Sequence, residues 1–386
     1  MIEMRTFFPG RLALQQRVIP AYRVGFFDSL AEVCEDGLSI FAGEVHPDES
    51  IPTTDHLQVA RYFQSRNLHF LNPQSPYYFL WQKGFVNWLE NWNPDVLIVE
   101  ANPRYLSTSR GIRWMHKQQK PVIGWGLGAP PIESQSSPIG RFNARWRTRS
   151  RKRFISQLDA LIAYSHRGVS EYLSLTDPRQ QVFVASNAVA KRPDGQPPMR
   201  SPGFDERPKV LFVGRIQPRK RIDNLLRACA SLPEGLQPLL WVVGDGPARA
   251  ELQELADEIY PSAEFPGKKL GLELEEYFLR ADLFVLPGTG GLAVQEAMAY
   301  GLPVIVAEGD GTQEDLVKSG NGWLIPANRE QELRKTLQEA LVDPTRLRKM
   351  GKNSFKIVQE EINIEQMVKV FVKALNSFGS NSENSQ

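Results

Sequence analysis

Residues 281–306 read ADLFVLPGTGGLAVQEAMAYGLPVIV. The apolar run ADLFVL predicts a buried strand, and Val304–Ala307 predicts the strand that follows it. Between the two strands, a loop with three glycines leads into a predicted helix over Ala293–Tyr300. A strand, a helix and a second strand in this order form the repeating unit of a parallel sheet that helices cover on both faces.

The same alternation fills both halves of the chain. The strands predicted in the first half are Leu38–Phe41, Val96–Val99, Pro121–Gly124, Ala160–Ala163 and Gln181–Val184, with helices over Pro76–Trp92 and Tyr105–Lys120 among them. Those of the second half are Lys209–Val213, Leu239–Val243, Asp282–Leu286, Val304–Ala307 and Gly322–Ile325. The pattern predicts an α/β fold with two doubly wound, Rossmann-like domains. Ligands of such sheets bind at the carboxyl ends of the strands, so we expect the two domains to face a central cleft.

A proline-rich stretch, residues 188–209, separates the two halves and indicates a linker. The predicted domains are 1–190 and 209–360, joined by a linker over 191–208. They are followed by a helix over 361–377 that packs back on the first domain and by a polar, disordered tail over 378–386.

The composition is that of a soluble globular protein, with 41% hydrophobic and 23% charged residues and a net charge of +2. This balance gives no reason to expect nucleic acid as a partner. Two distant cysteines and five histidines predict neither a disulfide framework nor a zinc site. No signal peptide and no membrane-spanning segment are predicted, and we expect a cytoplasmic protein that contacts at most the inner face of a membrane.

Two cations follow the first strand of the second half. In VLFVGRIQPRKRIDNLL the strand ends at Gly214, Arg215 comes next, and Lys220 precedes a predicted helix. The helix dipole does not favour cations at a helix N-terminus, so they indicate an anion such as a diphosphate at this place. The alternative is a solvated basic loop.

Glu296 is predicted in the first turn of the helix over Ala293–Tyr300. One interpretation is that it caps the helix and complements the helix dipole. The other is that it accepts hydrogen bonds from the hydroxyls of a ribose.

Gly244-Asp245-Gly246, with Glu264 about 20 residues later, is similar to the start of a dinucleotide-binding fingerprint. The third glycine is missing, because Arg249 occupies its position. A tight turn with Pro247 at the start of a helix is the alternative.

Taken together, VGRIQPRKRIDNLL, VVGDGP and ADLFVLPGTGGLAVQEAMAYGLPVIV resemble the C-terminal domain of retaining nucleotide-sugar glycosyltransferases of family 4. The resemblance is strong over residues 208–345 and weaker in the first half. It implies the GT-B fold, with an acceptor-binding first domain and a donor-binding second domain. It also implies sugar transfer from a nucleoside diphosphate sugar to a glycan or lipid-linked acceptor, as in polysaccharide or glycolipid biosynthesis. An epimerase on the same architecture and a non-catalytic sugar-nucleotide-binding protein are the alternatives.

The resemblance also implies roles for matching residues. Arg215 and Lys220 are the expected catalytic residues, which clamp the diphosphate and stabilise the departing nucleotide without a metal or other cofactor. Glu296 is expected to hold the ribose, and Lys269 and Leu270 to line the base. The other donor-binding residues implied are Gly25, Gly214, Gly290, Gly291, Leu292 and Ala293.

The chain departs from the family pattern at Gly288, where relatives have the first of two glutamates, and in lacking a histidine near residues 124–131. We expect glycine to leave the site more open there, for a sugar that lacks a hydroxyl or carries a bulky group at that edge.

A basic segment, residues 141–154, reads RFNARWRTRSRKRF. Arg141, Arg145 and Arg149 form one helical stripe, beside Phe142 and Trp146. A solvated amphipathic helix is one interpretation, and contact with anionic lipid headgroups or a phosphorylated acceptor is the other.

Overall fold

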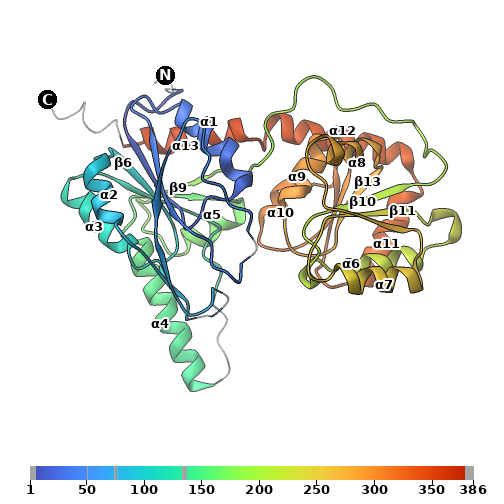
Figure 1. Ribbon diagram of the computed structural model, residues 1–386, viewed down its shortest axis with the longest axis horizontal. Helices are drawn as coiled ribbons and strands as arrows, with labels where there is room; N and C mark the ends of the chain where they lie inside the picture. Colours follow the sequence, from blue (N-terminus) through green and yellow to red (C-terminus); the bar gives the residue numbers. More distant parts are fainter. Residues whose placement is uncertain (1–5, 50, 74, 76, 133–136, 379–386) are drawn as a thin grey trace. The chain divides into compact units, whose positions relative to one another are not determined.

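The computed structural model describes residues 6–378 with the exception of residues 50, 74, 76 and 133–136. The chain divides into two compact units, one of Met1–Asn187 with Ile364–Gln386 and one of Ala188–Asn363. Each unit contains a parallel sheet between helices (Figure 1), which confirms the predicted α/β fold. Residues 379–386 of the predicted tail lie outside the described residues.

The first unit has a seven-stranded parallel sheet in the order β3-β2-β1-β6-β7-β8-β9. Its strands are β1 (Leu12–Gln15), β2 (Leu38–Gly43), β3 (Arg61–Ser65), β6 (Val96–Glu100), β7 (Val122–Gly126), β8 (Ala160–Ala163) and β9 (Gln181–Val184). A separate antiparallel hairpin consists of β4 (Asn67–Phe70) and β5 (Phe79–Gln82). The helices are α1 (Val24–Glu32), α2 (Phe85–Trp92), α3 (Thr108–Lys117), α4 (Pro138–Ile155), α5 (His166–Leu173) and α13 (Ile364–Asn376).

The helix predicted over Pro76–Trp92 is wrong in its first half, where β5 lies instead, and Pro76 is outside the described residues. The aromatic and apolar residues of Phe79–Gln82 favour a strand, and they pair with β4. Gly84, with φ 79°, then turns the chain into α2, because glycine adopts this left-handed conformation without steric cost.

Helix α13 belongs to the first unit although its residues follow the second unit in the sequence. It packs on α1 and on the edge of β8 and β9. The ring of Phe371 lies 4.9 Å from that of Phe26 and 5.1 Å from that of Trp125, all three buried. Apolar residues at helical spacing, from Ile364 to Leu375, form the face that is buried in this contact.

The second unit has a six-stranded parallel sheet in the order β12-β11-β10-β13-β14-β15, which is the strand order of a Rossmann fold. Its strands are β10 (Lys209–Val213), β11 (Leu239–Val243), β12 (Ala263–Gly267), β13 (Leu283–Leu286), β14 (Val304–Ala307) and β15 (Gly322–Ile325). Its helices are α6 (Ile222–Ala230), α7 (Arg249–Ile259), α8 (Leu272–Arg280), α9 (Leu292–Ala299), α10 (Thr312–Leu316), α11 (Glu330–Leu341) and α12 (Pro344–Glu360). Strands β13 and β14 are fully buried, as the continuous apolar runs of the sequence predict.

The proline-rich segment over residues 191–208 follows the surface of the second unit. The guanidinium of Arg200 donates hydrogen bonds to the backbone carbonyls of Phe278 (2.8 Å) and Ala281 (3.0 Å), at the end of α8. Arg348 on α12 donates to the carbonyl of Ser201 (2.8 Å). These contacts hold the segment in place beside α8 and α12.

Candidate functional site

Arg215 and Lys220 lie on the connection between β10 and α6. Gly214 follows β10 directly with φ 153°, and the exposed Arg215 comes next, at the carboxyl end of the strand. Lys220 ends a short 3-10 helix, Pro218–Lys220, and α6 begins after Arg221. The chain therefore places both cations at the edge of the sheet where doubly wound folds bind their ligands.

Lys220 is joined to the glycine loop between β13 and α9. Its ammonium donates a 2.7 Å hydrogen bond to the backbone carbonyl of Thr289. The guanidinium of Arg219 donates to the hydroxyl of Thr289 (3.0 Å), whose backbone N–H donates to the carbonyl of Arg219 (3.2 Å). Since β10 and β13 are neighbours in the sheet, these contacts make one surface of the two loops that follow them.

Gly290 leaves room for the ammonium of Lys220. A Cβ atom at this position would lie 2.4 Å from Lys220 Nζ, and the residue has φ 136°, which favours glycine. The backbone carbonyl of Gly290 accepts a 2.7 Å hydrogen bond from the side chain of Gln313. The bare backbone at residue 290 is thus what allows the cation to approach the loop.

Burial, together with the neighbouring Arg219 cation, lowers the pKa of Lys220 to about 8. An anion bound close to this amine would therefore stabilise its protonated form and raise its pKa. A bound diphosphate would supply that negative charge.

Helix α9 begins at Leu292, and its N-cap residue Gly291 makes no side-chain capping hydrogen bond. The first N–H groups of a helix have no partner within it, so those of Leu292 and Ala293 are available to a ligand in the loop. With Lys220 beside them, they form an arrangement suited to phosphate oxygens.

Glu296 lies in the second turn of α9, not in the first turn as predicted, because α9 begins at Leu292. The helix has no acidic residue in its first turn, which makes the capping interpretation of Glu296 wrong. Its side chain reaches solvent, yet burial among the surrounding residues raises the pKa of the carboxyl. A ligand that donates hydrogen bonds would stabilise the charged form of this carboxylate.

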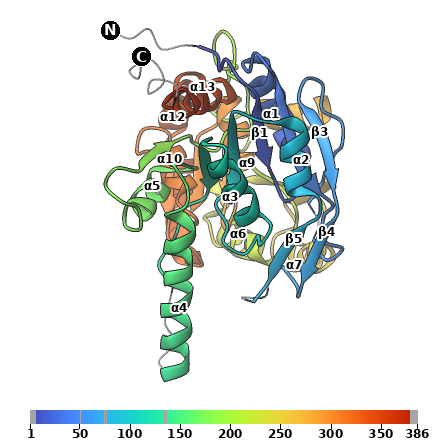
Figure 2. The ribbon, with the colours of Figure 1, turned by 90° about the vertical axis from the view of Figure 1, so that its left-hand side faces the viewer.

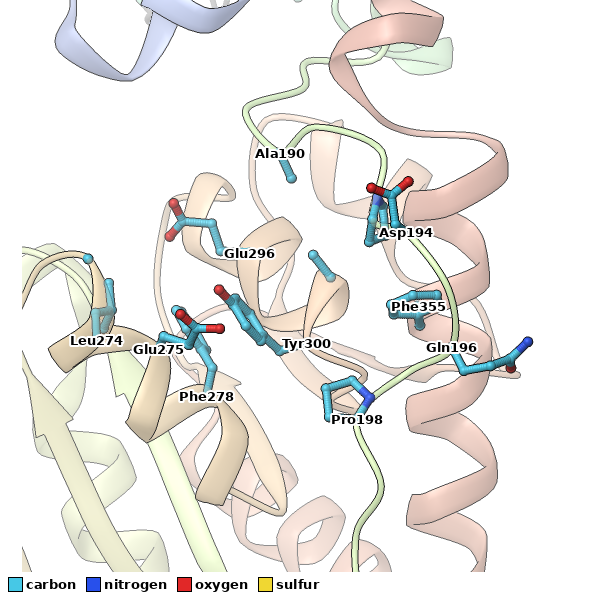
Figure 3. A pocket seen from close by; sticks show the side chains of 13 residues that line it. Ala190, Asp194, Gln196, Pro198, Leu274, Glu275, Phe278, Glu296, Tyr300 and Phe355 are labelled. Carbon is cyan, nitrogen blue, oxygen red and sulfur yellow. The ribbon is translucent and has the colours of Figure 1, made fainter.

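Glu296 lines a cavity of about 500 Å³ in the second unit (Figure 3), a size that suits a small organic ligand. Helices α8 and α9 form much of its wall, and residues 190–198 and α12 form the remainder. The lining residues are Ala190, Pro193, Asp194, Gln196, Pro198, Gly271, Leu274, Glu275, Phe278, Glu296, Ala299, Tyr300 and Phe355.

Lys269 and Leu270, predicted to line the base, directly precede the cavity residue Gly271 and are not part of its wall. Lys269 forms an ion pair with Glu273 (3.3 Å), and Leu270 is 65% exposed. The structure brings α8 residues to the cavity instead, among them Leu274 and Glu275.

Gly288 does not open the site, contrary to expectation. The residue is buried, and a Cβ atom there would lie 2.3 Å from the carbonyl oxygen of Arg219 and 2.7 Å from the Cα of Lys220. The glycine therefore lets the backbone of the cationic loop pack against the β13–α9 loop. A glutamate at residue 288 would require the backbone to move.

Gly25 belongs to the first unit, as the second residue of α1. A Cβ atom there would lie 3.4 Å from the side chain of Ile364. The glycine thus lies where α13 begins its contact with α1.

Gly244 and Gly246 are explained by loop packing. A Cβ atom on Gly244 would lie 1.9 Å from the carbonyl oxygen of Gly214, and one on Gly246 would lie 2.2 Å from that of Ile216. Glu264, the expected ribose ligand of a dinucleotide fingerprint, accepts a 3.0 Å hydrogen bond from the indole N–H of Trp241. The fingerprint residues are therefore engaged in the fold of the second unit itself.

Three residues near Glu296 were not predicted from the sequence: Asp194, Glu275 and Tyr300. Tyr300 follows Glu296 by four residues, which places both on one face of the helix. This spacing could have predicted Tyr300 as a neighbour of Glu296. Asp194 and Glu275 come from distant parts of the sequence, and no local pattern connects them with Glu296.

Helix α4 carries the basic segment and extends away from the sheet of the first unit (Figure 2). It contains seven Lys and Arg residues and no Asp or Glu. Phe142 and Trp146 are 70% and 58% exposed, and the stripe of Arg141, Arg145 and Arg149 is exposed beside them. Among the described helices, none has both the length and the apolar composition needed to span a bilayer.

The chain is similar to known glycosyltransferases in sequence and in structure. Residues 199–357 match the family Glycosyl transferases group 1. A GDP-mannose-dependent alpha-mannosyltransferase of Mycobacterium tuberculosis is 35% identical over 175 residues, which cover 44% of this chain and 41% of the relative. A GDP-mannose-dependent alpha-(1-6)-phosphatidylinositol monomannoside mannosyltransferase of Mycolicibacterium smegmatis is 30% identical over 183 residues, covering 44% and 48%. The matches span less than half the length of these relatives.

Solved structures resemble the chain over nearly its whole length. Sucrose-phosphate synthase of Thermosynechococcus elongatus has a TM-score of 0.69 at 19% identity, with 96% of this chain and 99% of that chain covered. HepE of Anabaena in complex with UDP-glucose has a TM-score of 0.62 at 15% identity, with 96% and 100% covered. The chain therefore has the GT-B fold, and its residues 199–357 match the family Glycosyl transferases group 1.

Proposed function

We propose that the protein is a retaining glycosyltransferase that moves a sugar from a nucleoside diphosphate sugar to a glycan or lipid-linked acceptor. The observation that carries this proposal is the hydrogen bond from Lys220 to the carbonyl of Thr289, which sets a cation beside the N-terminus of α9. Glu296 lies one turn further along the same helix and lines the cavity. A diphosphate beside Lys220 and a ribose beside Glu296 would belong to one nucleotide.

The chemistry that these residues support is stabilisation of a leaving group. When the bond between the sugar and the diphosphate breaks, negative charge develops on the departing diphosphate. Lys220, Arg215 and the N–H groups at the start of α9 would stabilise this charge without moving, which lowers the barrier. We propose that these cations take the place of a divalent metal and that no side chain forms a covalent bond to the sugar, in keeping with the family 4 resemblance.

We further propose that the enzyme contacts anionic membrane lipid through α4. A helix with seven cations, no acidic residue and two exposed aromatic side chains has the chemistry of a helix that lies at a lipid headgroup layer. One curated relative is named for transfer to a phosphatidylinositol monomannoside, a lipid acceptor. A lipid-linked acceptor would place the substrate of this enzyme at the same surface.

Turnover of a panel of GDP-, UDP- and ADP-hexoses, with and without glycan and phosphatidylinositol acceptors, tests the proposal. Transfer to an acceptor supports it. Conversion of the donor into another sugar nucleotide without acceptor would identify an epimerase, and binding without any turnover would identify a non-catalytic protein. Addition of EDTA should leave the rate of transfer unchanged, and a rate restored only by a divalent cation would exclude the metal-independent mechanism.

A further inference from the structure

The cavity that Glu296 lines is acidic. Asp194, Glu275 and Glu296 contribute carboxylates, and none of its described lining residues is a lysine or an arginine. Such a wall accepts hydrogen bonds and repels acceptor groups of a ligand. The part of the ligand that enters this cavity is therefore one that presents N–H or O–H donors.

Glu275 and Tyr300 lie next to each other in this wall. The ring of Tyr300 stacks on that of Phe278, with centroids 5.2 Å apart and planes 5° from parallel. Figure 3 shows the two side-chain ends next to each other on the cavity wall. An ionised carboxylate has about four acceptor sites, so Glu275 can accept more than one hydrogen bond from a ligand.

The Tyr300 hydroxyl keeps its proton. Burial raises the pKa of Tyr300, and the carboxylates of Glu275 and Glu296 raise it further. Tyr300 therefore presents an O–H donor beside the carboxylate of Glu275. Glu296 lies four residues, or about 6 Å along the helix axis, before Tyr300.

We propose that Glu275, which lies beside Tyr300 on the cavity wall, selects a guanine base in the donor nucleotide. This inference rests on the proposed function, with the ribose at Glu296. The Watson–Crick edge of guanine presents two adjacent donors, the N1–H and the 2-amino group, and a carboxylate can accept both. Uracil presents one N–H between two carbonyl acceptors, and adenine pairs its amino group with an acceptor nitrogen, so each would set an acceptor against the carboxylate.

Calorimetric binding of GDP, IDP, UDP and ADP to the full chain tests this assignment. GDP should bind about tenfold or more tightly than UDP or ADP, because a site built for hydrogen bonds discriminates against a ligand that leaves them unmade. IDP differs from GDP only in lacking the 2-amino group and should bind more weakly than GDP. This comparison needs no variant of the protein.

Glu275→Gln should weaken the binding of GDP about tenfold, weaken the binding of IDP less, and leave the binding of UDP nearly unchanged. Tyr300→Phe keeps the ring that stacks on Phe278 and should narrow the preference for GDP over UDP only in part. Glu276→Gln is the matched control, since Glu276 is the exposed neighbour of Glu275 and does not line the cavity.

Equal binding of all four nucleotides, or an equal effect of Glu275→Gln on each of them, would overturn the guanine assignment and leave the proposed transferase intact. Failure of every nucleoside diphosphate to bind would instead refute the proposed function.

Discussion

The ammonium of Lys220 lies 2.7 Å from the backbone carbonyl oxygen of Thr289, so that a cation of one loop is seated on the glycine-rich loop of the neighbouring strand. This contact brings positive charge to the N-terminus of α9 before any ligand is present. The arrangement requires little movement when a diphosphate binds, which is the condition under which charged groups stabilise a transition state most.

Replacement of Lys220 or of Arg215 by alanine should lower kcat about 10²-fold or more, because each variant lacks a preorganised group that stabilises the leaving diphosphate. Steady-state rates with a confirmed donor provide the measurement. Arg227→Ala, an exposed cation on α6, is the control and should retain its rate. Rates near that of the unmodified enzyme for both variants would remove the two residues from the catalytic machinery.

The affinity for a nucleoside diphosphate should depend on pH through Lys220. In the free protein the pKa of Lys220 is lowered to about 8, and a bound diphosphate stabilises the charged form and raises it. Affinity is therefore full below pH 8 and decreases as the pH rises above 8, by at most about tenfold per pH unit. Calorimetry between pH 6.5 and about 9.5 measures this. Lys220→Arg should flatten the profile, because arginine stays charged, and an unchanged profile would assign the dependence to another group.

Glu296→Gln should weaken the binding of nucleotides, because Glu296 is proposed to accept hydrogen bonds from their ribose hydroxyls. We expect a loss of about tenfold for a nucleoside diphosphate, since a hydrogen bond to a charged group is replaced by one to a neutral amide. A 2′,3′-dideoxy analogue should bind the unmodified protein and the variant alike. If the variant weakens the dideoxy analogue as much as the natural nucleotide, Glu296 does not contact the ribose hydroxyls. Glu332→Gln, on the exposed face of α11, controls for the loss of one carboxylate.

Gly288→Ala should destabilise the protein by about 1–3 kcal/mol, because the added Cβ would lie 2.3 Å from a backbone carbonyl oxygen and the loops would have to separate. Gly235→Ala is a suitable control, since a Cβ there has nothing within 4 Å. Thermal unfolding of the two variants side by side gives the comparison. Equal stability of both would show that the loops around residue 288 separate without cost.

Replacement of Arg141, Arg145 and Arg149 by glutamine should weaken binding to phosphatidylserine vesicles by about 1 kcal/mol for each arginine, and added salt should weaken binding of the unmodified protein. The matched control changes Lys349, Lys352 and Lys356, three exposed lysines on α12, to glutamine. Cosedimentation with vesicles measures both variants. Loss of binding in the control alone, or in neither variant, would return α4 to the interpretation of a solvated helix.

Five of the six strands of the second unit follow from the sequence because each is a short apolar run. Strand β12 (Ala263–Gly267) does not, because its sequence AEFPG is not an apolar run and is only partly buried. Lys209–Val213 and Leu239–Val243 have the predicted bounds. Strand β1 was missed, although it lies inside the first sheet. It ends in Gln15, a fully buried polar residue. The side-chain amide of Gln15 donates a hydrogen bond to the amide oxygen of Gln82 (2.7 Å) and accepts one from the hydroxyl of Thr108 (2.9 Å). Those partners come from distant segments, so no local pattern reveals that the glutamine is satisfied inside the core.

The candidate site also has one part that the sequence predicts and one part that it does not. Lys220, Gly290 and Glu296 follow strands along the chain, so the topology of a parallel sheet predicts where they lie. The packing of Gly288 and the position of Tyr300 beside Glu275 depend on distances between loops and helices, which a single sequence does not contain. This is why glycine at residue 288 was interpreted as open space when it is in close contact with backbone.

The return of α13 to the first unit has a consequence for synthesis on the ribosome. Phe26 and Trp125 leave the ribosome early, while Phe371, which covers them, follows only after the whole of Ala188–Asn363. At about 5–20 residues per second, that interval lasts on the order of 10 s or longer. During this time the nascent first unit exposes an aromatic surface to chaperones and to other chains. A premature stop codon just before Ile364 would therefore damage the half of the protein that was made first.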